Sequence, residues 1–150
     1  MALPMSMSTR YVLARLSIVE SVLAVRCTRR FTPLTVLVLA VDHFGSPDPR
    51  LGAACPGFLE VLKGVAAGDT WVKLSAPYRL GGADPQAYVD ELLAAGGARQ
   101  LLWASDWPWV SHENEQTYRT CLDQLESWVP DDAQRRIILT ESPRAVMALP

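Results

Sequence analysis

Three apolar runs of the sequence each end in side chains that can do acid–base or binding chemistry. A carboxylate can act as a general base toward water, and an imidazole ring can donate or accept a proton. A guanidinium group matches the planar geometry of a carboxylate. The side chains at these three ends are Asp42 and His43; Ser75, Tyr78 and Arg79; and Ser105 and Asp106.

The residue types leave more than one role open for each of these side chains. Asp106 is a general base that activates water, a metal ligand, or the cap of the turn that follows it. His43 ligates a metal, polarises a carbonyl group, or pairs with Asp42 within its own loop. Arg79 binds a substrate carboxylate or is an ordinary surface arginine.

The three apolar runs have the length and composition of strands that are buried on both faces. They cover residues 35–41 (TVLVLAV), 70–75 (TWVKLS) and 100–105 (QLLWAS). Short continuous apolar runs of this kind are typical of parallel sheets. Lys73 lies in the middle of the second run, on the side opposite its apolar neighbours, and therefore needs a partner.

Helices are predicted between and after these strands, from proline or aspartate at their starts and glycine at their ends. The predicted helices cover residues 56–68, 85–96, 114–128 and 132–139, with a last helical turn from Ser142. Strands that alternate with helices indicate βαβ units and an α/β fold with a parallel sheet. Because parallel strands end at the same rim, His43, Arg79 and Asp106 are expected to converge there.

The start of the chain differs from the remainder in charge and pattern. The first 41 residues contain five arginines and one acidic residue, whereas the rest of the chain is net acidic. Residues 1–10 are small, polar and methionine-rich, which is typical of disorder, and the apolar spacing of residues 11–25 predicts a helix. We therefore predict a basic head over residues 1–34, partly disordered or helical, and a folded region over residues 35–150.

Composition excludes several classes of function. The chain has 150 residues and a formal net charge of −2, without the electrostatic footprint of a nucleic-acid-binding protein. The longest apolar run, residues 34–41, is far shorter than the roughly 20 residues of a membrane-spanning helix. Three cysteines without CxxC spacing fit a reducing compartment such as the cytoplasm. We therefore expect a small-molecule substrate, no nucleic-acid partner and no membrane partner.

Four segments of the folded region follow one another in a specific order, although each alone would be a weak signal. They are VDHFGSPDP at 41–49, WVKLSAPYRL at 71–80, LLWASDWPW at 101–109 and ILTESPRAV at 138–146. In this order they resemble the C-terminal portion of the amidohydrolase-related family, in the branch that includes the 2-pyrone-4,6-dicarboxylate lactonases.

The resemblance implies a (β/α)8 TIM barrel, of which this chain supplies about three C-terminal strands with their helices. It implies hydrolysis of lactones, amides or related carboxylated compounds. Asp106, at the end of the last strand, would then activate the hydrolytic water, and His43 would line the same pocket as a second catalytic residue. Arg79 corresponds to an arginine that binds a substrate carboxylate, and we assign the neighbouring Tyr78 to substrate binding as well.

The sequence also departs from the family pattern. Ser46 stands where the family usually has arginine, and the chain has no His-x-His pair, which the family carries on its first strand. We therefore assign no metal ligand, and a divalent metal such as zinc would belong to a complete barrel. A complete barrel needs about 250 residues and eight strands. We interpret the chain as a C-terminal fragment whose head arises from a frameshifted or misplaced start.

These inferences lead to one main hypothesis and two alternatives. The main one is a hydrolase of the amidohydrolase-related family that acts on a carboxylated lactone or similar cyclic substrate, truncated and therefore weakly active or inactive alone. The alternatives are a decarboxylase of the same superfamily and a non-catalytic α/β module that packs on a partner. Because three strands leave two open sheet edges, we also expect self-association through those edges.

Overall fold

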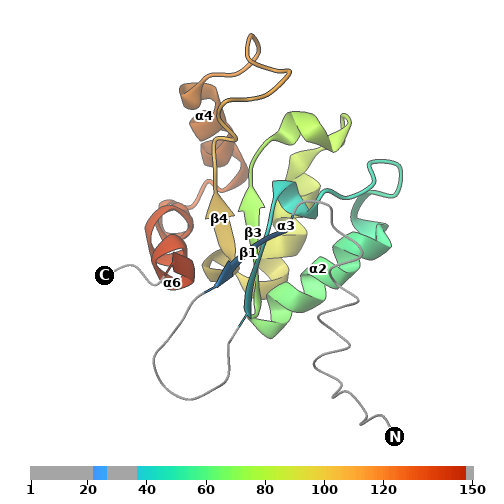
Figure 1. Cartoon of the computed structure of the whole chain (residues 1–150), viewed down its shortest axis with the longest axis vertical. Coiled ribbons are helices and arrows are strands. Elements are labelled where there is room, and N and C mark those ends of the chain that lie inside the picture. Colours follow the sequence, from blue (N-terminus) through green and yellow to red (C-terminus); the bar gives the residue numbers. More distant parts are fainter. Residues whose placement is uncertain (1–21, 27–36, 148–150) are drawn as a thin grey trace, which may run out of the picture.

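The computed structural model describes residues 22–26 and 37–147, which form a sheet with helices packed against it (Figure 1). The sheet has the strand order β1-β2-β3-β4. Strands β2, β3 and β4 are parallel to one another, and β1 is antiparallel to β2. The strands are β1 (Val22–Arg26), β2 (Leu37–Val41), β3 (Thr70–Leu74) and β4 (Leu101–Trp103).

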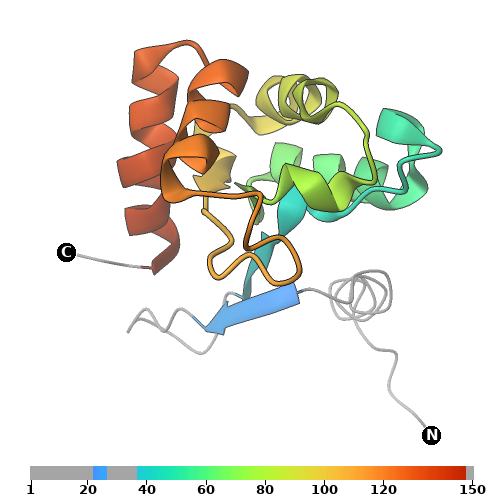
Figure 2. The same cartoon turned by 90° about the horizontal axis from the view of Figure 1, so that it is seen from above.

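Helices connect the parallel strands and follow the last one, as the alternating sequence pattern predicted. Helices α2 and α3 cover one face of the sheet, β1 is its edge strand beside β2, and α4 and α6 lie beyond β4 (Figures 1 and 2). The helices are α2 (Pro56–Ala67), α3 (Pro85–Gly96), α4 (Tyr118–Trp128), α5 (Asp132–Arg136) and α6 (Ser142–Met147), with a π-helical segment η5 (Ile137–Glu141) between the last two.

Alternate residues of the parallel strands face these helices and form the main core. Full burial of each such side chain stabilises the fold by about 1.5–3 kcal/mol relative to exposure. The Phe58 and Tyr88 rings, from α2 and α3, meet edge to face with centroids 5.2 Å apart. The fully buried strand and helix residues that pack together here are Val41, Val72, Leu74, Leu101, Phe58, Val65 and Leu92.

The predicted helix signals account for the starts of α3 and α5 and the end of α2. The Asp84 carboxylate accepts a hydrogen bond from the Gln86 N–H at 3.0 Å, as an N-cap does. Asp131 caps α5 in the same way. Gly68 ends α2 with a φ of 77°, a left-handed backbone conformation that glycine adopts without a steric penalty.

Gly96 allows helices α2 and α3 to approach each other closely. A Cβ atom added at Gly96 would lie 2.7 Å from Val65 Cγ1 and 2.8 Å from the Val65 carbonyl oxygen. Both distances are too short for real atoms, so any side chain here would push the two helices apart. Glycine at position 96 is therefore required by the packing of α2 against α3.

The predicted helix over residues 11–25 is wrong for its last part, because residues 22–26 form strand β1. The segment carries Val22 and Val25, whose β-branched side chains favour strands. Strand β2 also offers it an edge, and the pairing aligns Val22 with Val41 and Arg26 with Leu37. Residues 11–21 lie outside the described residues. The predicted sheet of three strands therefore has a fourth, antiparallel member on the β2 side.

Helix α4 begins later than the predicted start at Asn114. The Thr117 hydroxyl accepts a hydrogen bond from the Thr120 N–H at 3.1 Å, and the Thr120 hydroxyl accepts one from the Thr117 N–H at 2.9 Å. This reciprocal capping box fixes the first turn at Tyr118. Residues 104–117 consequently form a long loop at the carboxyl end of β4.

The sheet face opposite α2 and α3 carries a smaller apolar cluster. Ala40 and Leu102 pack there with Val146 of α6, and Trp71 lies against them. Lys73 projects from the same face and pairs with Asp42, its Nζ lying 2.6 Å from the Asp42 carboxylate. The lysine thus has the partner that its mid-strand position required. No helix of the described residues is long and apolar enough to cross a membrane.

Candidate active site

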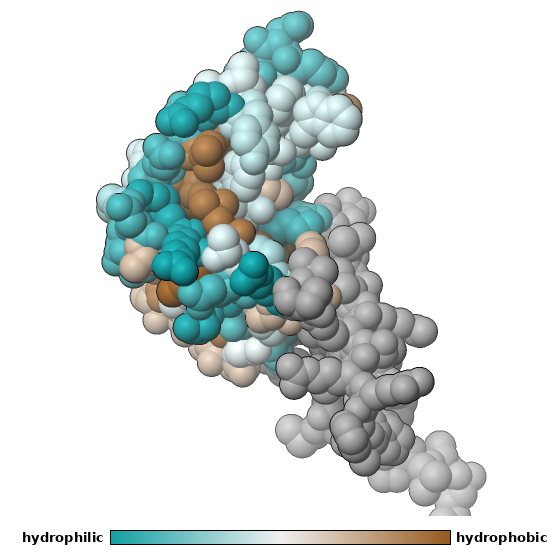
Figure 3. Space-filling model, turned by 90° about the vertical axis from the view of Figure 1, so that its left-hand side faces the viewer, coloured by the Kyte–Doolittle hydropathy of each residue, from teal (hydrophilic) through white to brown (hydrophobic). Residues whose placement is uncertain are grey.

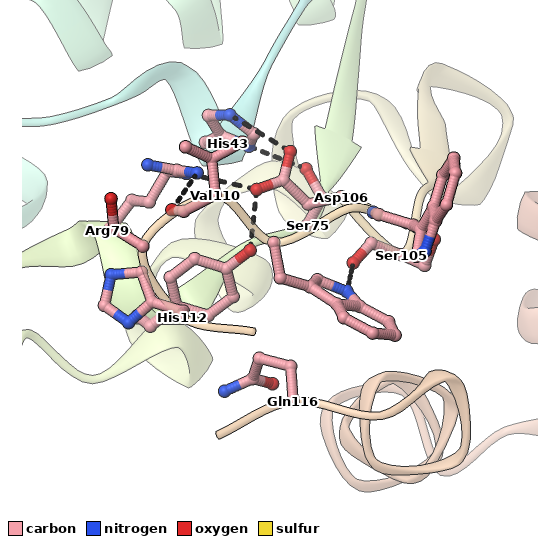
Figure 4. Close-up of polar contacts among 12 residues, drawn as sticks. His43, Ser75, Arg79, Ser105, Asp106, Val110, His112 and Gln116 are labelled. Atoms are coloured by element: carbon pink, nitrogen blue, oxygen red, sulfur yellow. Dashed lines mark hydrogen bonds and ion pairs between the residues drawn. The ribbon is translucent and has the colours of Figure 1, made fainter. Parts of the chain in front are cut away.

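The three parallel strands bring the predicted site residues together at their carboxyl ends (Figure 4). His43 begins the short turn η1 (His43–Gly45) that follows β2. Tyr78 and Arg79 lie in the turn η3 (Pro77–Leu80) after β3. Asp106 lies three residues beyond the end of β4. The expected convergence of His43, Arg79 and Asp106 is therefore present in the structure.

Asp106 is the centre of this cluster. The Tyr78 hydroxyl donates a hydrogen bond to Asp106 Oδ2 at 2.7 Å, and Arg79 Nε donates to the same oxygen at 3.1 Å. The other oxygen, Oδ1, faces His43 Nε2 at 3.7 Å, which is too long for a direct hydrogen bond. One oxygen of the carboxylate is thus engaged by two donors and the other faces the imidazole.

These contacts favour the ionised form of Asp106. Burial of the carboxyl group opposes ionisation, but the hydrogen bonds from Tyr78 and Arg79 outweigh it and lower the pKa of Asp106 below its usual value. Burial and the hydrogen bond to Asp106 raise the pKa of Tyr78, so its hydroxyl remains protonated and keeps donating. The cluster therefore presents an ionised carboxylate at the carboxyl ends of the strands.

The backbone is left-handed at a non-glycine residue just after each of the three parallel strands. The φ angles are 49° at His43, 49° at Ala76 and 61° at Asp106. A left-handed conformation costs an L-residue roughly 1–2 kcal/mol and persists only where the surroundings enforce it. Such residues concentrate at functional sites. Here they redirect the chain at the rim so that His43 and Asp106 face each other.

His43 contacts other side chains than Asp42, the loop partner that the sequence left open for it. Asp42 is engaged by Lys73, so it is not the partner of the imidazole. His43 Nδ1 instead lies 2.9 Å from the hydroxyl oxygen of Ser75, while its Nε2 faces Asp106. Both ring nitrogens are therefore directed into the cluster.

Arg79 and Tyr78 are further supported by the loop after β4. Arg79 Nη2 donates a hydrogen bond to the Val110 carbonyl oxygen at 3.3 Å. The imidazole of His112 lies against the Tyr78 ring, with centroids 4.4 Å apart. His112 in turn pairs with Glu115, 2.9 Å from Nδ1 to the carboxylate. This loop holds the two β3-end residues in place over Asp106.

Sequence reasoning did not assign a site role to Ser75, to His112 or to the Val110 carbonyl group. Ser75 stands among the polar residues at the end of the second predicted strand, and strand alternation places it on the same side as Lys73. The other two belong to a loop whose course no periodic pattern specifies. Trp107, next to Asp106, is 73% exposed and does not pack into the core.

The described residues do not form a metal centre by themselves. Within residues 22–26 and 37–147, no group of three or more His, Cys, Asp and Glu side chains is placed to hold a metal ion. Asp106 Oδ2 is already engaged by Tyr78 and Arg79. We therefore derive no chemical step through a metal.

The fold and the rim together define part of an α/β barrel whose polar residues gather at the carboxyl ends of its strands, where barrel enzymes have their active sites. A family model described as amidohydrolase matches residues 18–149, which is most of the chain. The chain therefore belongs to the amidohydrolase family. This agrees with the resemblance that the four sequence segments indicated.

Two solved structures are similar to this chain over about three-quarters of its length. A Pseudomonas putida protein assigned as a 2-pyrone-4,6-dicarboxylic acid hydrolase is 36% identical with a TM-score of 0.67, covering 75% of this chain and 43% of its own. An Acinetobacter baumannii protein with the same assignment, solved with citric acid bound, is 29% identical with a TM-score of 0.64, covering 77% and 45%.

A characterised relative carries a related name. The D-galactarolactone isomerase of Agrobacterium fabrum is 27% identical over 116 residues, which are 72% of this chain and 39% of the isomerase. The chain thus spans less than half the length of each of these three proteins. The partial barrel that the sequence predicted is confirmed by this coverage.

Proposed function

We propose that the site after β2, β3 and β4 hydrolyses a lactone ring that carries at least one carboxylate group. The observation that carries this proposal is the arrangement around Asp106, with one oxygen held by Tyr78 and Arg79 and the other facing His43. An ionised carboxylate beside an imidazole is a suitable pair for moving a proton from water to a leaving group.

The reaction follows from these positions. Asp106 Oδ1 accepts a proton from a water molecule, and the water oxygen attacks the lactone carbonyl carbon. The ring C–O bond then breaks, and the leaving alkoxide takes up the proton that Asp106 received. The products are one carboxylic acid group, which releases its proton to solvent, and one hydroxyl group on the same opened chain. His43 lies 3.7 Å from Oδ1 and is placed to stabilise the charge that develops on the carbonyl oxygen.

Arg79 is proposed to bind the substrate carboxylate. Its contacts within the described residues use Nε and Nη2, so Nη1 remains for an incoming acid. The guanidinium group also lies over the Tyr78 ring, with its central carbon 5.3 Å from the ring centroid. Support comes from the relatives, one solved with citric acid and two assigned to a dicarboxylic acid. We keep Tyr78 as a proposed substrate-binding residue because it and Arg79 contact the same oxygen of Asp106.

The test is the variant Asp106→Asn, with Asp123→Asn on the exposed side of α4 as the matched control. Turnover of 2-pyrone-4,6-dicarboxylate and of a sugar-acid lactone is followed, together with binding measured by tryptophan fluorescence. General-base catalysis contributes about 10²–10⁴-fold, so Asp106→Asn should lose at least a hundredfold in rate while Asp123→Asn retains it. Equal rates in Asp106→Asn and in the unmodified chain, or no binding and no turnover by any form, would refute the proposal.

A second candidate reaction is lactone isomerisation, which the similarity to D-galactarolactone isomerase favours. The same Asp106 and His43 pair would then move a proton between two positions of the substrate. Product analysis separates the reactions: a ring-opened acid supports hydrolysis, and a rearranged lactone supports isomerisation. Released carbon dioxide would instead support the decarboxylase alternative. We expect this chain alone to be slow in any of them, since it spans less than half of its relatives.

We also propose that the chain associates with a second copy. Within the described residues, β4 has a neighbouring strand on one side only, and an open edge invites pairing. The face that carries α4 and α6 shows apolar residues gathered in a band between hydrophilic ones (Figure 3). A cytoplasmic location remains a proposal as well; it is supported by Cys55 and Cys121, which are free thiols.

A further inference from the structure

Ser75 is a buried hydroxyl at the edge of the site with one polar partner. It follows β3 directly, is 3% exposed, and its Oγ lies 2.9 Å from His43 Nδ1 (Figure 4). No buried side-chain nitrogen or oxygen among the described residues lacks a hydrogen-bond partner. The Ser75 hydroxyl is therefore satisfied by His43.

The direction of this hydrogen bond follows from the inventory of donors and acceptors. A serine hydroxyl has one hydrogen to donate and two lone pairs that can accept. Leaving a buried donor without an acceptor costs about 1–3 kcal/mol. Among the described residues His43 Nδ1 is the acceptor within reach of the Ser75 hydroxyl. Ser75 consequently donates to Nδ1, and a neutral imidazole must then carry its own hydrogen on Nε2.

The opposite side of the ring leads to the same assignment independently. His43 Nε2 faces Oδ1 of Asp106, whose pKa is lowered and which is therefore an acceptor without a hydrogen. An Nε2 without hydrogen would direct a lone pair at this carboxylate, which is repulsive. An Nε2–H group directs a hydrogen at it. Ser75 after β3 and Asp106 after β4 thus favour the same tautomer of His43, the one with hydrogen on Nε2.

We propose that Ser75 is a positioning residue that holds neutral His43 in the Nε2–H tautomer, directed at the space beside Asp106 Oδ1. His43 is then a hydrogen-bond donor toward the substrate in its resting state, and Asp106 is the base. This assignment of roles rests on the proposed lactone chemistry, whereas the tautomer itself does not. It also specifies the substrate: an acceptor oxygen, such as a lactone carbonyl, must lie opposite Nε2.

The tautomer can be measured without any activity, because the chain contains two histidines. Long-range ¹H–¹⁵N spectra are recorded on ¹⁵N-labelled protein at about pH 9, where an ordinary histidine with a pKa near 6.5 is neutral. His112→Gln assigns the signals. The unmodified chain should show His43 with hydrogen on Nε2, and Ser75→Ala should shift it toward a mixture with the Nδ1–H form. Ser75→Thr keeps a hydroxyl and should restore the Nε2–H form.

A matched control excludes a general effect of removing a buried hydroxyl. Ser142 is 2% exposed and donates to the Ala98 carbonyl oxygen at 3.0 Å, away from the site. Ser142→Ala should leave the His43 signals unchanged, and the His112 signals report whether each variant is folded. An Nδ1–H form in the unmodified chain, or identical His43 spectra in Ser75→Ala and the unmodified chain, would overturn the proposal. If His43 is in the Nε2–H form but the chain turns over no lactone, the proposed function is rejected and the tautomer assignment stands.

Discussion

Replacing Tyr78 by phenylalanine tests the electrostatic account of Asp106 without touching the carboxylate. The substitution keeps the ring that lies against His112 and removes the hydroxyl that donates to Asp106 Oδ2 at 2.7 Å. A hydrogen bond to a charged group contributes about 1.5–3 kcal/mol to stability. Because Asp106 is about one-fifth exposed and Arg79 still donates to it, we expect a loss of about 1.5–2 kcal/mol at pH 7.

The pH dependence of this loss has a definite sign. The pKa of Asp106 is lowered in the folded chain, so its charged contacts stabilise the fold above the unfolded pKa of about 3.9. That contribution disappears as the pH falls through the folded pKa. Tyr78→Phe raises the folded pKa of Asp106, since burial then opposes ionisation with one donor fewer. The stability difference should therefore shrink between the pKa of the variant and that of the unmodified chain.

Urea unfolding followed by circular dichroism, at several pH values from about 7 to 3, measures this difference directly. Once the pH falls below the folded pKa of Asp106, its hydrogen bond with Tyr78 is neutral, and the difference falls toward about 0.5–1.5 kcal/mol. Tyr118→Phe is the control, because Tyr118 is exposed and its ring packs on Trp103. A Tyr78→Phe difference that is zero at pH 7, or constant down to pH 3, would refute the reasoning.

Three further outcomes are expected. Arg79→Met should raise the KM of a carboxylated lactone by roughly tenfold or more relative to a lactone without carboxylate, since it removes the charged hydrogen bonds; an equal change for both would show that Arg79 does not bind the acid. Gly96→Ala should destabilise the fold by about 1–3 kcal/mol in urea unfolding, because its Cβ would overlap Val65; unchanged stability would mean that α2 and α3 separate freely. Sedimentation at increasing concentration should show a dimer, and a monomer throughout would contradict the open-edge proposal.

The sequence predicted the parallel part of the fold well, because its signals are local. The runs that became β2, β3 and β4 are continuous and apolar, and the capping residues Asp84 and Asp131 act within one helical turn of their own position. Strand β1 was missed because its apolar spacing does not distinguish a strand from a helix. Residues 22–26 satisfy a helical spacing equally well, and the edge of β2 decides the outcome only once the sheet exists.

The sequence predicted which residues form the candidate site but not the hydrogen bonds between them. That His43, Arg79 and Asp106 share one rim follows from parallel strands, whatever their exact register. That Tyr78 donates to Asp106, and that Ser75 donates to His43, depends on side-chain positions after two left-handed turns. No sequence pattern specifies those turns, because they involve His43 and Ala76 rather than glycine. The sequence therefore could not predict the contacts at the carboxyl ends of the strands, which determine the chemistry.

The register of the sheet also determines whether the residues of the candidate site can meet. Val72 lies between Val41, the last residue of β2, and Leu101 on β4, and the residues that end β3 and β4, Leu74 and Trp103, are paired with each other. A slip of one residue would turn every side chain of β3 to the opposite face, taking Lys73 from Asp42. The Lys73–Asp42 pair, which is mostly buried, makes that slip costly because both charges would lose their partner. We infer that this pair, outside the reacting centre, maintains the spacing between His43 and Asp106.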